Sequence, residues 1–136
     1  MYTCRLKFKF EAAHILDEAF SKCCMDSIHG HSYIVEVFVS SNILNGEGMV
    51  LDFGLLKSKV KPLIDAWDHR LFIPKVLMVD NWMKLPPIRT FTNPTAENIS
   101  LWIYEMLKEM RPKLEFKVRL YETAVLKHTY CERSDF

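Results

Sequence analysis

Apolar and polar residues alternate in the first stretch of the chain, residues 2–13. Side chains on a strand point to its two faces in turn, so this period of two predicts a strand with one apolar and one polar face. A second alternating stretch, residues 30–40, predicts another strand of the same kind. A third strand is expected at residues 116–121, and a weaker fourth one at roughly 124–132.

Two other stretches have the spacing of amphipathic helices. In residues 53–66 the apolar side chains recur at helical intervals, and Asp52 is placed to cap the N-terminus. The second and stronger pattern begins at Asn93-Pro94-Thr95 and ends at Pro112. Between the two helices, residues 71–92 contain three prolines and no clear period, so we expect a long loop there.

The order of these elements is two strands, two helices and two strands, without an internal repeat. It predicts an α+β fold in which an antiparallel sheet carries both helices on one face. A chain of 136 residues is long enough for one hydrophobic core but not for two. We therefore expect a single domain over residues 1–136.

Composition and charge exclude several classes of protein. The net charge of +1 argues against a nucleic-acid-binding protein, which would show a clustered basic surface. No run of apolar residues approaches the length of about eighteen that a membrane span needs, and the N-terminus lacks the apolar core of a signal peptide. We therefore expect a cytoplasmic protein that binds neither nucleic acid nor a membrane. Its four cysteines are then expected to be thiols rather than a disulfide framework.

Three of the five histidines fall where the apolar faces of the strands end. His14 follows the inward-facing residues of the first strand, while His29 and His31, two positions apart, share the inward-facing parity of the second. Any one of them alone is more simply a hydrogen-bonded core histidine. Three converging imidazoles suit zinc, and a catalytic zinc site has three protein ligands and an open fourth position. The pattern therefore predicts a Zn²⁺ site.

Two further groups are candidates for proton transfer. Cys23 precedes His29 by six residues, so its thiol is a candidate base or nucleophile near the metal. The alternatives are a fourth zinc ligand, which would close a structural site, and a loop thiol without a role. Cys24 cannot be separated from Cys23 by this argument. Asp68-His69 follows the first helix, where an aspartate can fix the tautomer of the adjacent imidazole. A helix-terminal salt bridge with Arg70 is the simpler explanation of that aspartate.

A carboxylate ends one of the buried strand faces. Glu122 has the parity of the apolar residues within 116–120, and a buried carboxylate needs hydrogen-bond donors. The planar N–H/NH₂ edge of a pterin or purine-like ring supplies two such donors side by side, and a lysine or arginine partner is the alternative. Thr95 and Glu97 are most simply residues of a helix N-terminus.

Together these residues resemble the 6-pyruvoyltetrahydropterin synthase family, which includes the 6-carboxytetrahydropterin synthases of queuosine biosynthesis. The motifs that carry the resemblance, in the family's order, are Phe10-Glu11-Ala12-Ala13-His14, Cys23-x5-His29-Gly30-His31, Asp68-His69, Asn93-Pro94-Thr95-Ala96-Glu97-Asn98 and Tyr121-Glu122-Thr123. The resemblance implies the tunnelling fold, a ββααββ unit, for a single pterin synthase-like domain. It also implies a homohexamer of two trimers with active sites at the subunit contacts.

The resemblance implies a role for each candidate residue. The three histidines would bind catalytic zinc, and Cys23, Asp68 and His69 would move protons. Glu122 would anchor the pterin ring, and Thr95 and Glu97 complete the expected substrate-binding set. The implied enzyme is a zinc-dependent lyase that acts on 7,8-dihydroneopterin triphosphate with loss of triphosphate.

Two features of the sequence favour different products. The five residues between Cys23 and His29 resemble the pyruvoyl-forming enzymes, since carboxy-forming ones commonly have three there. The motifs Phe10–His14, Gly48–Phe53 and Asn93–Asn98 resemble the queuosine-pathway enzymes instead. We therefore predict 6-carboxy-5,6,7,8-tetrahydropterin as the product. The alternatives are a 6-pyruvoyltetrahydropterin synthase and a non-catalytic zinc- or pterin-binding homologue. A zinc hydrolase of another fold is disfavoured because no carboxylate accompanies the ligand pair as in His-Glu-x-x-His.

Overall fold

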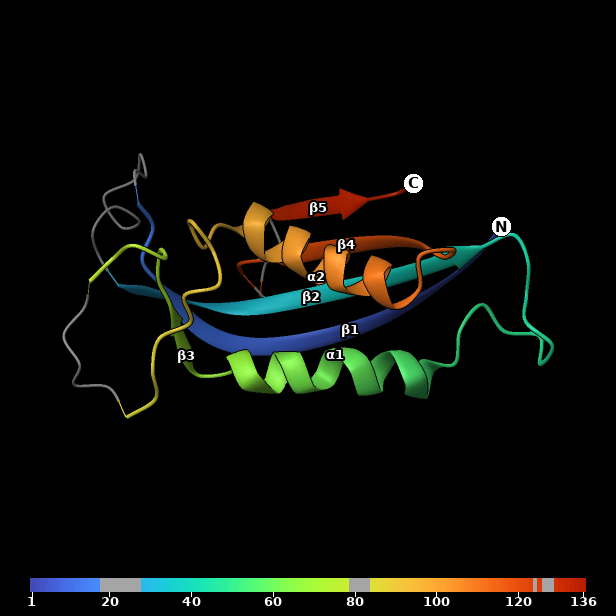
Figure 1. Cartoon of the computed structure of the whole chain (residues 1–136), viewed down its shortest axis with the longest axis horizontal. Coiled ribbons are helices and arrows are strands. Elements are labelled where there is room, and N and C mark those ends of the chain that lie inside the picture. The colour runs from blue at the N-terminus through green and yellow to red at the C-terminus, as the bar shows by residue number, and fades with distance from the viewer. Residues whose placement is uncertain (18–27, 79–83, 124, 126–128) are drawn as a thin grey trace.

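A computed structural model describes residues 1–17, 28–78, 84–123, 125 and 129–136 of the chain (Figure 1). Five strands form one sheet, and two helices lie against it. In chain order the elements are β1 (Tyr2–His14), β2 (His29–Ser41), α1 (Phe53–Trp67), β3 (Arg70–Phe72), α2 (Ala96–Met110), β4 (Glu115–Tyr121) and β5 (Tyr130–Ser134). The predicted α+β fold with two helices is therefore confirmed.

The strands are ordered β3-β1-β2-β4-β5 across the sheet. The pairs β1–β2, β2–β4 and β4–β5 are antiparallel, as predicted. The short strand β3 runs parallel to β1, so the sheet is mixed rather than purely antiparallel. The last two residues of β3 lie in the segment 71–92, where the sequence pattern predicts a loop. A three-residue strand is too short to show a period, so the pattern did not reveal it. β5 also lies further along the chain than the predicted stretch 124–132.

The long strands β1 and β2 have one apolar and one polar face, as their alternation predicts. Phe8 pairs with Val35 and Phe10 with Tyr33, and all four side chains are buried. Phe10 and Tyr33 also stack, with ring centroids 4.8 Å apart. The apolar face continues onto β4, and Phe72 of β3 joins it, so a single cluster of buried side chains spans four strands and both helices.

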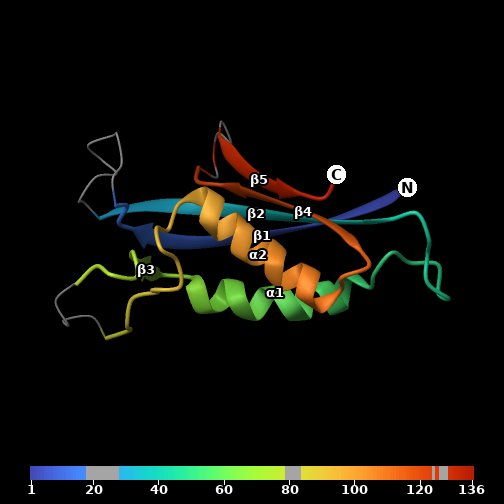
Figure 2. The same ribbon diagram turned by 45° about the horizontal axis from the view of Figure 1, so that its top comes forward.

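Both helices cover this apolar face, and Figure 2 shows them side by side in front of the sheet. Asp52 caps α1, as predicted, by accepting a hydrogen bond from the Leu55 N–H at 2.9 Å. Thr95 caps α2 in the same way. The indole rings of Trp67 and Trp102, one from each helix, lie 5.6 Å apart. Neither described helix is long and apolar enough to cross a membrane.

The opposite face of the sheet carries charged and polar side chains. At its centre Glu36 is only 4% exposed, and its carboxylate accepts hydrogen bonds from Arg5 at 3.2 Å and from the Tyr121 hydroxyl at 3.1 Å. Burial, together with the neighbouring Glu36 carboxylate, raises the pKa of Tyr121. The two faces of the sheet therefore differ in chemistry, and the three histidines point toward the helix-covered one.

Candidate metal centre

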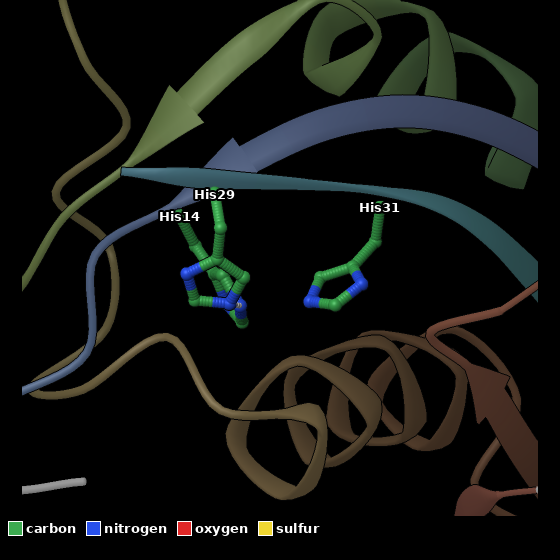
Figure 3. Close-up of side chains that lie close together, drawn as sticks. All are labelled: His14, His29 and His31. Atoms are coloured by element: carbon green, nitrogen blue, oxygen red, sulfur yellow. Dashed lines mark hydrogen bonds between the residues drawn. The ribbon is translucent and has the colours of Figure 1, made fainter. Parts of the chain in front are cut away.

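The three predicted ligands converge at one end of the sheet. His14 is the last residue of β1 and His29 the first of β2, and the antiparallel register places them directly opposite each other. His31 lies two positions further along β2 on the same face. Figure 3 shows the three side chains extending from the sheet toward the same space. One ring nitrogen of each residue lies within 4.8 Å of the others, which makes this a candidate metal site among the described residues.

His14 is held as a neutral imidazole of defined tautomer. Its side chain is fully buried, and its Nδ1–H donates to the carbonyl oxygen of Pro94 at 2.8 Å. Burial lowers the pKa of His14 to about 4, although the Pro94 carbonyl opposes the shift. The ring is therefore uncharged at neutral pH. Its Nε2, which carries no proton in this tautomer, faces the Nε2 of His29 at 2.6 Å.

His31 contributes a buried nitrogen that has no hydrogen-bond partner among the described residues. This atom is Nε2, and a carboxylate oxygen of Glu122 lies 3.9 Å from it. Burial lowers the pKa of His31, and the charge of Glu122 acts against that shift. A buried polar atom without a partner is rare in proteins, and it is explained here if the atom is a metal ligand.

The donor set and its spacing fit zinc. Tetrahedral zinc with Zn–N bonds of 2.0–2.1 Å holds its ligand nitrogens about 3.3 Å apart. The His14 and His29 nitrogens lie 2.6 Å apart, closer than that value, and all three ligand nitrogens lie within 4.8 Å of one another. Neutral imidazoles are common zinc ligands, and three of them leave a fourth coordination position for water or substrate.

The predicted substrate-binding residues lie beside this triad. Glu122 follows β4, and the strand end is held to β2 by a bridge between Ser32 and Thr123. A cavity of about 230 Å³ is lined by Glu122 together with Thr95, Glu97 and Tyr130. Thr95 is the N-cap of α2 and Glu97 lies in its first turn, so the simple structural interpretation of both residues is correct. Their part in substrate binding stays a prediction.

Asp68 and His69 lie apart from this cavity, at the edge of β1. Asp68 Oδ1 accepts a hydrogen bond from the Glu11 N–H at 2.8 Å, which lowers the pKa of Asp68. Its Oδ2 lies 3.1 Å from Nδ1 of His69, so the carboxylate orients the neighbouring imidazole. Arg70 does not form the predicted salt bridge with Asp68. It donates instead to the backbone carbonyls of Ala66 and Pro86.

The backbone of His69 has the left-handed conformation, with φ at 59°. Its N–H donates to the Glu11 carbonyl at 2.6 Å, which holds this unusual conformation against the sheet edge. The imidazole itself is 77% exposed and lines a second cavity, of about 810 Å³, to which His31 also contributes. The pair is thus oriented and accessible but stands outside the Glu122 pocket. Cys23 and Cys24 lie outside the described residues.

The sequence did not reveal the backbone partner of His14. The Pro94 carbonyl is 80 residues away in the chain, and a carbonyl has no side-chain signature. The Asn93-Pro94-Thr95 motif marked only the start of a helix. Its position against His14 depends on how α2 packs across the sheet.

The fold and the site together define a class: a small α+β protein with a candidate metal centre of three imidazoles beside a carboxylate-lined pocket. A family model described as 6-pyruvoyl tetrahydropterin synthase matches residues 3–133, so the chain belongs to that family. The resemblance inferred from the sequence motifs is thereby confirmed.

Several relatives match the chain over nearly its whole length. Proteins named 6-carboxy-5,6,7,8-tetrahydropterin synthase from Rickettsia typhi and Haemophilus influenzae are 32% and 31% identical to it. These alignments cover 90% and 97% of this chain and 95% and 98% of the relatives. Among solved structures, the 6-pyruvoyl tetrahydropterin synthase of Caenorhabditis elegans superposes with a TM-score of 0.72 at 25% identity, over 99% of this chain and 96% of its own. The Plasmodium falciparum 6-pyruvoyl tetrahydropterin synthase, at 19% identity, shows the same fold with a TM-score of 0.73 over 98% of both chains.

Proposed function

We propose that this protein is a 6-carboxy-5,6,7,8-tetrahydropterin synthase, a zinc-dependent lyase that acts on 7,8-dihydroneopterin triphosphate with loss of triphosphate. The observation that carries the proposal is the convergence of three imidazoles beside the pocket that Glu122 lines. Full-length relatives named for this activity support it. The domain extends over residues 1–136, and the enzyme works in the cytoplasm.

His14, His29 and His31 are the residues that would hold the zinc ion. What the bound ion supplies is polarisation of the side-chain hydroxyls of the substrate. The protein contributes the orientation of its ligands, because the Pro94 carbonyl keeps the Nδ1 proton on His14 and directs Nε2 toward the metal position. Three protein ligands leave room for the substrate in the fourth position.

Glu122 anchors the pterin ring in this proposal. Its two carboxylate oxygens accept from the N–H and NH₂ groups on one edge of the ring, a bidentate contact that fixes orientation as well as affinity. The carboxylate lies 3.9 Å from Nε2 of His31, so the anchored edge of the ring lies beside the histidine triad. Thr95 and Glu97 line the same pocket.

Proton transfer is assigned to Cys23 and to the Asp68–His69 pair. Asp68 faces Nδ1 of His69 and favours the tautomer that carries its proton on that nitrogen. Nε2 of His69 is then unprotonated and can accept a proton from a substrate carbon. Both residues lie at a sheet edge, and the imidazole is exposed. An exposed sheet edge has unpaired backbone N–H and C=O groups that can pair with another chain. We infer that the pair serves the active site of a neighbouring subunit in a hexamer of two trimers.

Mixing two inactive variants tests this assembly. Asp68→Asn and His31→Ala subunits each lose a different part of the site. If the pair acts across a contact, mixed oligomers regain sites in which every part is intact, and activity returns. Oligomers that stay inactive after exchange of subunits, with exchange verified by mass spectrometry, would contradict the assignment.

The 6-pyruvoyl product is the second candidate, and the five-residue spacing between Cys23 and His29 favours it. Zinc-loaded protein is incubated with 7,8-dihydroneopterin triphosphate, and the products are identified by mass spectrometry. Release of triphosphate with 6-carboxytetrahydropterin supports the proposal, and 6-pyruvoyltetrahydropterin supports the alternative. Unchanged substrate that nevertheless binds with micromolar affinity would indicate a non-catalytic homologue.

A further inference from the structure

The orientation of His14 depends on the Pro94 carbonyl, which belongs to the peptide group between Pro94 and Thr95. The Pro94 oxygen accepts the Nδ1–H of His14 at 2.8 Å, and both residues are buried. A metal-bound histidine is oriented by the group to which its other nitrogen donates. The nitrogen of Pro94 belongs to the preceding peptide group and carries no hydrogen, so it forms no hydrogen bond that could orient this carbonyl. The hydrogen bonds of Thr95 and of the neighbouring residues therefore set the direction of the Pro94 oxygen.

The backbone on either side of Pro94 forms a tight turn. The Thr95 N–H donates to the Asn93 carbonyl at 2.9 Å, which closes a three-residue turn centred on Pro94. The Asn98 side-chain amide donates to the same carbonyl at 2.8 Å. Because Asn98 lies in the first turn of α2, this second bond joins the turn to the helix. In this turn the Pro94 oxygen faces His14 at the end of β1.

The side chain of Asn93 joins the turn to the end of β1. Its Oδ1 accepts from the Asp17 N–H at 3.0 Å, and its Nδ2 donates to the Asp17 carbonyl at 3.0 Å. Asp17 comes three residues after His14. A single amide side chain therefore pairs with both backbone groups of one residue. The segments that carry His14 and Pro94 are thus held together by this pairing as well as by the His14–Pro94 hydrogen bond.

We propose that Asn93 is a positioning residue of the metal centre, acting through Pro94 on the tautomer and ring orientation of His14. This inference rests on the proposed zinc site. It adds a residue that touches neither metal nor substrate. A purely structural role for Asn93 predicts lower stability with unchanged metal affinity, and a positioning role predicts weaker metal binding as well.

The test compares zinc affinity in Asn93→Ala with that of a matched control. Asn45→Ala also removes two side-chain-to-backbone hydrogen bonds, from the N–H groups of Glu47 at 3.0 Å and Met49 at 2.9 Å. Asn45 lies in the loop between β2 and α1, at the far end of the molecule from β3 (Figure 1). Zinc dissociation constants are measured by competition with a chromophoric chelator, on protein whose folding is verified by circular dichroism. Cobalt substitution gives an absorption spectrum that reports ligand geometry.

We expect the zinc dissociation constant to rise about tenfold in Asn93→Ala, at the lower end of the effect of outer hydrogen-bond partners, and the cobalt spectrum to change. Asn45→Ala keeps the wild-type values of both. Wild-type zinc affinity in Asn93→Ala overturns the inference and leaves the zinc site intact. A wild-type protein without zinc affinity overturns the zinc site itself, and the inference with it.

Asn93→Asp covers the case in which Asn93→Ala does not fold. The aspartate keeps an acceptor for the Asp17 N–H but has no donor for the Asp17 carbonyl, so it removes half of the pairing. We expect an intermediate zinc affinity in this variant. Wild-type affinity in folded Asn93→Asp contradicts the positioning role.

Discussion

Replacing His31 by alanine should separate metal binding from folding. The His31 side chain is 22% exposed, and its buried Nε2 has no hydrogen-bond partner among the described residues. Removing the ring therefore breaks no hydrogen bond at that atom, and we expect the metal-free protein to lose on the order of 1 kcal/mol of stability. The same change at His14 empties a fully buried site and leaves the Pro94 carbonyl unpaired, so it should cost about 2–4 kcal/mol.

Zinc should then stabilise the wild-type protein but not the variant. A ligand present at a hundred times its dissociation constant stabilises the folded state by about 2.7 kcal/mol. If the loss of one of three imidazoles weakens zinc binding a hundredfold, the same zinc concentration contributes only about 0.4 kcal/mol. The difference between these two values is larger than the expected cost of the substitution in the metal-free protein.

Urea denaturation with and without zinc measures both quantities in one experiment. Metal content after gel filtration gives an independent value for occupancy. A His31→Ala protein that keeps the wild-type zinc-induced shift would show that His31 is not a ligand. A metal-free variant that is unfolded at 25 °C would show that the ring is part of the core, and the reasoning from its unpaired nitrogen would be wrong.

Four further substitutions, in three experiments, test the site and the fold. Glu122→Gln replaces one of two acceptor oxygens by a donor, so we expect KM to rise by about 10- to 100-fold in steady-state kinetics while zinc content stays unchanged. Cys23→Ala should lose about 10²–10⁴-fold in turnover and keep its zinc, whereas Cys24→Ala remains active; the reverse order of activities would make Cys24 the base. Asp135→Asn tests the pH dependence of stability. Burial alone raises the pKa of Asp135, but hydrogen bonds led by that from the Tyr104 hydroxyl bring it below the usual value of 3.8. The folded state therefore binds this proton more weakly than the unfolded state does, so the ionised carboxylate stabilises the fold above pH 3.8 and that stabilisation disappears as the pH falls through the lower folded pKa. Urea midpoints should differ between wild type and variant at pH 7 and approach each other as the pH falls below 3.8 through the lower folded pKa; a difference that does not change with pH would show that ionisation is not the cause.

The sequence alone determined the features that depend on local periodicity. Alternation along residues 2–13 and 30–40 shows which side chains share a face, and that parity placed all three histidines on the core side. The sequence also identified Asp52 and Thr95 as residues of the helix N-termini, because a capping side chain reaches only three residues along its own helix. Such features arise from the backbone geometry of one element.

Only the tertiary structure decided how separate elements meet at the site. The bond from His14 to Pro94 joins residues 80 positions apart, and β3 is too short to carry a pattern. The docking of Asp68 on the edge of β1 and the approach of Glu122 to His31 likewise join distant segments. Sequence motifs identified these residues as candidates, but their distances follow from strand register and from helix packing across the sheet. Those depend on how the whole core fills its volume, and no local stretch of sequence specifies that.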